Sequence, residues 1–242
     1  MEILNHILSA IDNDAPVVEI LRGIHWTALV SRFCGLSSTM LRDCIDDHKE
    51  TEPLLFTGKT AVQLAQLSLS SDIGKASLGL AAINSLISID PAHCTEVNAA
   101  QIIMEKGRGK NIAIVGHFPF VDELKGVAKN LWVIEKWQRP GDYPEEDASQ
   151  LLPQSDVIAI SSTTLINHTL ESLLSLCPKS GFIMLLGPTT PMTDVLFEYG
   201  VDMISGSMVV DTQRALTYIK QGANFRQLKR SGAIRLLTIG KQ

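Results

Sequence analysis

Aromatic residues and positive charge are scarce in this chain, and each shortage excludes a class of function. Phe, Trp and Tyr together make up 5% of the 242 residues, too few for a platform that stacks the bases of single-stranded nucleic acid. Acidic residues outnumber basic ones, 26 to 21, which gives a formal net charge of −5. Proteins that bind nucleic acid usually carry a basic face instead. We therefore expect no nucleic-acid partner.

Cysteine and long apolar runs are also in short supply. The four cysteines (Cys34, Cys44, Cys94 and Cys177) contain no Cys-x-x-Cys pair, so their spacing predicts neither a structural zinc site nor a disulfide framework. No apolar run approaches the ~20 residues that cross a bilayer, and we expect no membrane partner. Residues 1–3 (MEI) lack the basic lead of a secretory signal. These features predict a reduced, cytoplasmic protein.

Strand-like and helix-like segments alternate in the second part of the chain, after the basic, glycine-rich stretch 106–110. Runs typical of strands buried on both faces occupy 111–116, 131–135, 155–160, 181–187 and 201–205. Helical patterns occupy 121–129, 145–152, 163–176, 193–199 and 211–221, and 234–239 adds a strand of unassigned direction. Such strands form parallel sheets covered by helices on both sides. We predict a doubly wound, Rossmann-like domain over residues 107–242.

The first part of the chain, residues 1–106, has the mixed pattern of a small α+β domain. Its predicted elements are a helix at 3–11, a hairpin of strands 16–22 and 26–33, a flexible loop at 35–38, and helices at 58–69 and 72–88. The last helix is apolar on nearly every side except at Asn84, so it should be buried. Asn84 either bonds to a neighbouring backbone or lines a cleft.

The candidate site follows from the predicted sheet, because ligands of doubly wound sheets bind beyond the carboxyl ends of the strands. Most residues at these positions are glycines or carry hydroxyls, which lets backbone amides approach a ligand. The candidates are Gly116, His117, Phe118, Glu135, Thr163, Thr164, Asn167, Gly187, Pro188, Thr189 and Gly206, joined by Gly35 and Ser37 if the two domains face each other.

His117 and Glu135 are the candidates with the most distinctive chemistry. His117 follows the first strand and could ligate a metal, exchange protons near neutral pH, or serve as a satisfied structural residue. Glu135 lies about twenty residues past Gly116, where dinucleotide-binding folds place the acid that holds a ribose. Glu135 could instead ligate a metal or be a strand-end charge. The loop after Gly116 reads GHFP, which is not the complete G-x-G-x-x-G signature.

Thr163 and Asn167 lie four residues apart and would share one face of a helix. A helix N-cap would account for a single hydroxyl at this position. It leaves Asn167 unexplained, so we favour a ligand contact for both residues.

Four strings of the second part carry a resemblance to a known family. They are 115–119 (VGHFP), 133–136 (VIEK), 163–170 (TTLINHTL) and 186–191 (LGPTTP). Their type and order resemble the family called "putative heavy-metal chelation" proteins, in which an enolase N-terminal-like domain precedes a Rossmann-like one. The resemblance implies a site in the cleft between the domains for a heavy metal or a metal-bearing small molecule, and it implies no established reaction.

Three functions compete at this point. The first is metal handling in the cleft, with His117 and Glu135 as metal ligands; the lack of a Cys/His cluster favours a hard metal or a chelated complex. The second is an enzyme that uses a nucleotide-like cofactor, S-adenosylmethionine or a dinucleotide. The third is a binding or oligomeric scaffold without catalysis, which leaves a homo-oligomer open.

Overall fold

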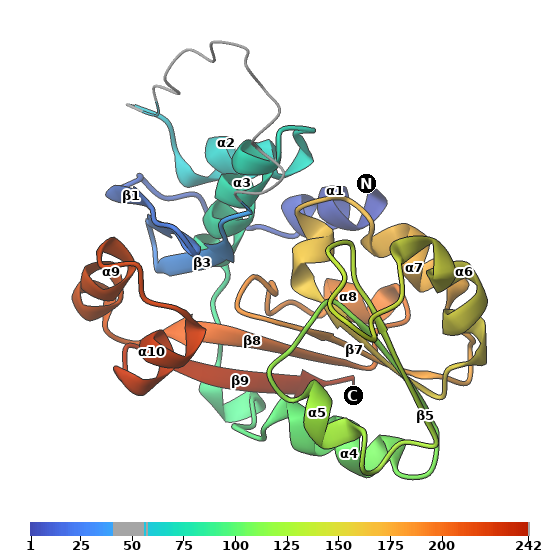
Figure 1. Ribbon diagram of the computed structural model, residues 1–242. Coiled ribbons are helices and arrows are strands. Elements are labelled where there is room, and N and C mark those ends of the chain that lie inside the picture. The colour runs from blue at the N-terminus through green and yellow to red at the C-terminus, as the bar shows by residue number, and fades with distance from the viewer. Residues whose placement is uncertain (41–55, 57, 242) are drawn as a thin grey trace.

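The computed structural model describes residues 1–40, 56 and 58–241, and the elements fall into two groups (Figure 1). The smaller group contains α1 (Glu2–Ser9), β1 (Glu19–Arg22), β2 (Trp26–Val30), β3 (Cys34–Ser38), α2 (Ala61–Ala65) and α3 (Ile73–Leu86). The larger group begins with α4 (Ala99–Gly107), β4 (Asn111–Val115), α5 (Val121–Leu124), β5 (Asn130–Ile134), α6 (Ala148–Leu151), β6 (Val157–Ser161) and α7 (Leu170–Leu176). It ends with β7 (Phe182–Leu186), α8 (Val195–Glu198), β8 (Met203–Val209), α9 (Thr212–Lys220), α10 (Phe225–Arg230) and β9 (Ile234–Gly240). Among the residues described, no helix has the length and apolar character that crossing a membrane requires.

The smaller domain is an antiparallel sheet, β1-β2-β3, packed against α3. The hairpin of β1 and β2 is confirmed by its register, which pairs Glu19 with Val30. The prediction of a flexible loop at 35–38 is wrong, because these residues form most of the buried strand β3. Small residues are needed there for packing: a Cβ on Gly35 would lie 2.1 Å from the backbone oxygen of Ala81 in α3.

The larger domain confirms the doubly wound sheet. Its strand order is β5-β4-β6-β7-β8-β9, parallel except that β9 runs antiparallel to β8. The chain passes from β4 to β5 on one side and then returns to β6 on the other. The order therefore reverses between β4 and β6, which is where doubly wound folds bind ligands.

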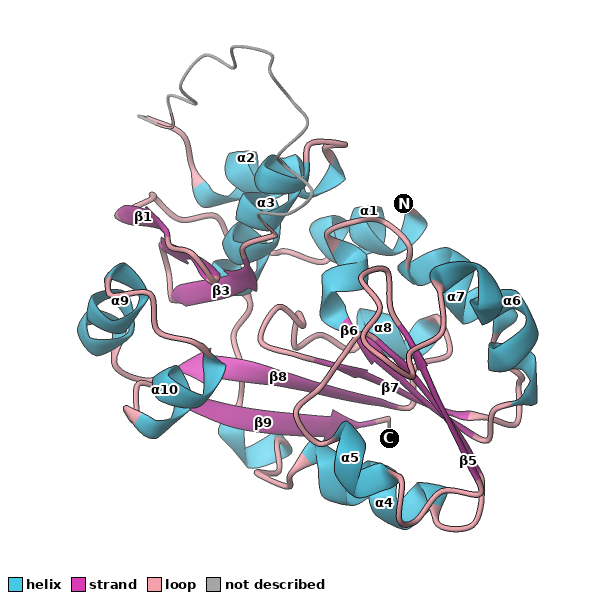
Figure 2. Ribbon diagram, in the orientation of Figure 1, coloured by secondary structure: helices cyan, strands magenta, loops and turns pink. Residues whose placement is uncertain are grey.

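Alternate residues along the central strands face two different cores, as the two-residue period of a strand requires. On one face, Ile112 and Ile114 of β4 lie in a cluster with residues of α4 and α5. On the other face, Ala113 of β4 and Ile158 of β6 lie in a cluster with residues of α7 and α8. Figure 2 shows the two helical layers, with α4 and α5 on one side of the sheet and α6, α7 and α8 on the other.

Several predicted bounds change in the structure. The helix predicted over 163–176 is interrupted: a 3₁₀ turn, Ser162–Leu165, precedes α7, and between them His168 adopts a positive φ of 59°. Strand β8 continues to Val209, so Gly206 lies inside the strand and not at its end. Helices α4 and α10 were not predicted.

The division between the domains lies close to α4. The predicted boundary at residue 106 falls inside this helix, whose Ile103 packs with strands of the larger domain. We therefore propose a boundary between α3 and α4. The two domains also share a core, since Leu80 of α3 and Leu185 of β7 belong to the same buried cluster.

Candidate functional site

The carboxyl ends of β4, β6 and β7 open onto a cavity of about 570 Å³, which we call the interdomain cavity. It is lined at these ends by His117, Phe118, Ser162, Thr163, Gly187 and Pro188, and from the smaller domain by Trp26 and Ser38. The volume lies within the range of roughly 300–1,000 Å³ that is typical of small-molecule sites. The cavity is therefore large enough for an organic ligand and not only for an ion.

Aromatic rings form part of the wall of the interdomain cavity. The rings of Phe118 and Phe120 stack with centroids 5.3 Å apart, and the ring of Phe225 lies 6.1 Å from that of Trp26. The Trp26 side chain is fixed by a 3.0 Å hydrogen bond from its indole N–H to the Ala223 carbonyl. Fixed rings of this kind give an apolar surface of defined shape.

Two cations and two carboxylates line the interdomain cavity, and one of the carboxylates is neutralised by an ion pair. Helix α10 contributes Arg226 and Lys229, and no described residue forms an ion pair with either side chain. Of the two carboxylates in the lining, Glu96 is paired with Arg235, which leaves Glu123. The cavity thus favours a ligand with negative charge.

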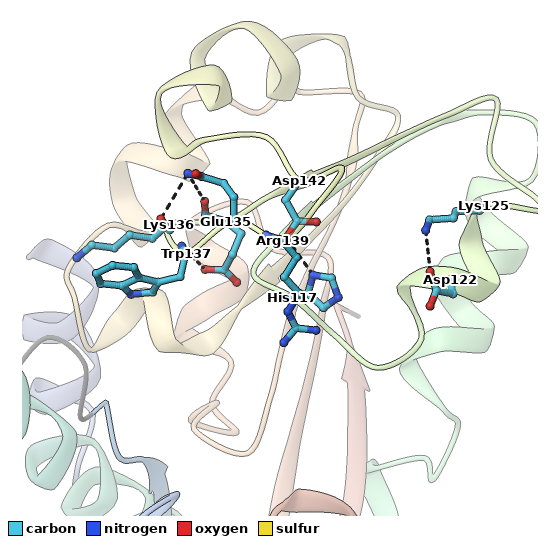
Figure 3. Close-up of polar contacts among 9 residues, drawn as sticks. His117, Asp122, Lys125, Glu135, Lys136, Trp137, Arg139 and Asp142 are labelled. Atoms are coloured by element: carbon cyan, nitrogen blue, oxygen red, sulfur yellow. Dashed lines mark hydrogen bonds and ion pairs between the residues drawn. The ribbon is translucent and has the colours of Figure 1, made fainter.

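His117 is oriented by a carboxylate. Its Nδ1 lies 3.2 Å from Oδ2 of Asp142, whose side chain is only 5% exposed (Figure 3). Asp142 is held in place because Tyr143 pairs with the end of β5: the Tyr143 N–H donates to the Val133 carbonyl at 2.7 Å. A carboxylate on one ring nitrogen fixes the tautomer and leaves the other, Nε2, as a possible metal donor.

A bare metal ion does not fit this donor set. The described residues contain no group of three or more His, Cys, Asp or Glu side chains that could hold an ion. Burial raises the pKa of the Cys34 thiol to about 12 and that of Cys177 to about 11, so neither offers a thiolate near neutral pH. A single histidine suits a metal whose other positions are already filled by an organic ligand.

A second cavity, of about 290 Å³, lies beyond the ends of β4, β5 and β6, beside α6 and α7; we call it the β5-edge cavity. Gly116, Glu135, Trp137 and Asn167 are part of its lining. It shares Ser161 and Thr163 with the interdomain cavity. The two cavities therefore meet at the end of β6.

The predicted site residues divide among three places. The interdomain cavity takes His117, Phe118, Gly187, Pro188 and Gly206; the β5-edge cavity takes Gly116, Glu135, Thr164 and Asn167; Thr163 lines both. The cavity linings do not include Gly35, Ser37 or Thr189, which lie in buried contacts within and between the domains. His117 and Glu135, predicted to hold one metal together, line different cavities.

Thr189 and Asn84 join the two domains through hydrogen bonds. The Ser38 N–H donates to Thr189 Oγ1 at 2.9 Å, and this hydroxyl donates to Ser38 Oγ at 3.1 Å. Asn84 donates from Nδ2 to the Leu36 carbonyl at 2.8 Å and to the Thr189 carbonyl at 3.0 Å. Asn84 thus bonds to backbone of both domains, which settles the alternative left open by the sequence.

Sequence reasoning missed Asp142, Arg226 and Lys229. Nothing local to Asp142 indicates its role, because it reaches His117 only through the pairing of Tyr143 with β5. Helix α10 does have a signal: Asn224 and Gln227 form a capping box, which the spacing N-x-x-Q indicates.

Fold and cavities together define a class: a two-domain α/β protein with a cavity between a small antiparallel-sheet domain and a Rossmann-like domain. Residues 98–238 match a family model described as "Putative heavy-metal chelation", and residues 4–87 match a second model with the same description. The first match covers more than half of the chain, so the protein belongs to this family. The predicted resemblance is confirmed.

One curated relative matches most of this chain, and two solved structures have its fold. An uncharacterised protein of Methanocaldococcus jannaschii is 26% identical over 227 residues, which cover 89% of this chain and 87% of that protein. A crystal structure of a family member of unknown function from Desulfitobacterium hafniense has a TM-score of 0.83 at 27% identity, covering 99% and 98% of the two chains. A family member of unknown function from Pyrococcus horikoshii, at 21% identity and the same coverage, has a TM-score of 0.84 and shows the fold.

Proposed function

We propose that the protein binds an anionic, metal-bearing small molecule in the interdomain cavity, and that His117 supplies one donor to the metal. The observation that carries the proposal is His117 itself, which lines the cavity while Asp142 holds its other ring nitrogen. The metal is cargo in this proposal, and its remaining positions are filled by the organic part of the ligand. The family's description supports the link with heavy metals.

The surroundings of His117 support a complex over a free ion. The aromatic wall would contact the organic part of the ligand, and Arg226 and Lys229 would attract its negative charge. The absence of a three-donor group among the described residues also argues against a free ion.

Two measurements test the proposal. The first is elemental analysis of the purified protein together with mass spectrometry of the small molecules that co-purify with it. We expect metal in the native protein and in Glu135→Gln, and loss of metal in His117→Ala. An absence of metal in the native protein, or its full retention in His117→Ala, would contradict the proposal.

The second measurement uses a defined probe, the anionic complex of nickel with nitrilotriacetate, in a calorimetric titration. We expect His117→Ala to weaken binding by at least about tenfold, or ~1.4 kcal/mol. The matched control is His93→Ala, because His93 is also paired with an aspartate, Asp90 at 2.8 Å, but is 69% exposed and lies outside the cavity. Equal losses in both variants would show ordinary surface binding to histidine.

A further inference from the structure

The β5-edge cavity has a lining unlike that of the interdomain cavity. Its charged residues are Glu135, Glu145, Glu146 and Lys136, so carboxylates predominate. Trp137, which is 52% exposed, belongs to the same lining. The proposed function uses none of these residues.

Glu135 is fixed in its backbone and nearly unpartnered in its side chain. Its N–H donates to the Tyr143 carbonyl at 2.9 Å, which extends the pairing beyond the end of β5. Among the residues that the structure describes, its carboxylate accepts only a 3.5 Å contact from the Trp137 N–H (Figure 3), which is long for a hydrogen bond. A carboxylate with free lone pairs in a cavity can accept two hydrogen bonds from neighbouring hydroxyls of one ligand.

The position of Glu135 in the sheet matches that chemistry. It follows β5, the strand next to β4, and the sheet order reverses between β4 and β6. At this reversal Gly116 has a φ of +99°, and a Cβ there would lie 2.9 Å from the Cβ of Ser161. At this point the cavity is lined by a residue without a side chain, Gly116, and Glu135 belongs to the same lining. Doubly wound folds place a glycine and an acidic residue in this way where they bind the hydroxyls of a ribose.

Phosphate groups do not suit the same cavity. The loop after β4 continues from Gly116 as His117-Phe118-Pro119 and lacks the glycines that cradle a pyrophosphate. Helix α5, which follows, has only four residues and begins with Asp122 and Glu123 in its first turn. The carboxylates of the lining repel anions as well.

We propose that the β5-edge cavity binds a nucleoside without phosphates, with Glu135 accepting hydrogen bonds from the ribose diol and Trp137 stacking on the base. The class includes neutral nucleosides and cationic ones such as a nucleoside sulfonium. This inference is independent of the proposed function, which concerns a different cavity.

Calorimetric titrations with four compounds test the inference. Adenosine and S-adenosylmethionine represent the neutral and cationic members of the class, and we expect at least one of them to bind. The better binder of these two is the reference. We expect 2′-deoxyadenosine to bind at least tenfold more weakly than the reference, because it lacks the diol. We expect the same of adenosine monophosphate, because it adds negative charge. Absence of binding by both nucleosides, or equal binding of the deoxy or the phosphorylated compound, would overturn the inference.

Variants assign the binding to the cavity. Glu135→Gln keeps the shape of the side chain and should weaken binding at least tenfold, while the exposed Trp137→Ala should weaken it severalfold. Glu123→Gln is the matched control, since Glu123 lines only the interdomain cavity, and it should bind like the native protein. Native affinity in Glu135→Gln would refute the assignment. Retained nickel–nitrilotriacetate binding in Glu135→Gln would show that the interdomain cavity is intact.

Discussion

The hydroxyl of Thr189 offers the sharpest test of how the two domains are joined. Thr189 is fully buried, and its Oγ1 both accepts from the Ser38 N–H and donates to Ser38 Oγ. Thr189→Val keeps the volume and removes both hydrogen bonds. One lost hydrogen bond costs ~1 kcal/mol, and the half-buried Ser38 N–H left without an acceptor adds ~1 kcal/mol or more. We expect the free energy of unfolding to fall by about 2–3 kcal/mol.

Urea unfolding followed by circular dichroism measures this loss, and Thr190→Val is the matched control. Thr190 is equally buried in the same loop, but its hydroxyl donates to the Gly187 carbonyl, which also accepts the Thr190 N–H. Its loss leaves no orphaned group and should cost ~1 kcal/mol or less. Thr189→Ser should stay close to the native protein. Equal losses for Thr189→Val and Thr190→Val would refute the reasoning that the contact between domains carries the larger cost.

Three further predictions concern stability. In urea unfolding, Gly35→Ala should lower the free energy of unfolding by about 3 kcal/mol or more, since its Cβ would overlap the Ala81 carbonyl at 2.1 Å. The control Gly126→Ala, whose Cβ meets nothing closer than 4.0 Å, should change the free energy of unfolding little. Burial raises the pKa of the Cys34 thiol from 9.0 to about 12, so the stability that the buried thiol contributes is complete below pH 9 and is lost as the pH rises toward 12. The difference in free energy of unfolding between the native protein and Cys34→Ala should therefore shrink by ~1 kcal/mol between pH 8 and pH 10. A difference that stays constant over this range would contradict the prediction. Ser68→Ala should be neutral or stabilising by up to ~1 kcal/mol in urea unfolding, because the buried Ser68 hydroxyl has no hydrogen-bond partner among the described residues. A loss of 2 kcal/mol or more would contradict this prediction, because it is the loss expected for a hydroxyl that makes good contacts.

The sequence predicts the Rossmann-like sheet well because its strands are strongly apolar and buried on both faces. Ile112–Ile114 and Ile158–Ile160 show this most clearly, with residues facing each of two cores. Strand β3 was not predicted because Cys34–Ser38 is rich in the small residues typical of loops. Those small residues reflect the close approach of α3, which is a tertiary contact and leaves no periodic pattern in the sequence.

The candidate site was predictable only where chain topology fixes it. The ends of parallel strands must share one edge, and this rule brings His117, Gly187 and Pro188 to one cavity. It does not show that His117 and Glu135 line different cavities, because the end of a strand fixes where a side chain starts and not which cavity it faces. Thr189 looked like a ligand contact for the same reason, and its burial against Ser38 depends on how the domains pack.

The bridge from Asn84 to the carbonyls of Leu36 and Thr189 ties the smaller domain to the larger one. With the two domains tied in this way, the proposed ligand would be selected by the fixed size and charge of the cavity. Helix α10 supplies the lysine and the arginine of this lining, Lys229 and Arg226. Altered preference for cargo should arise through substitutions on α10, while the bridge is preserved.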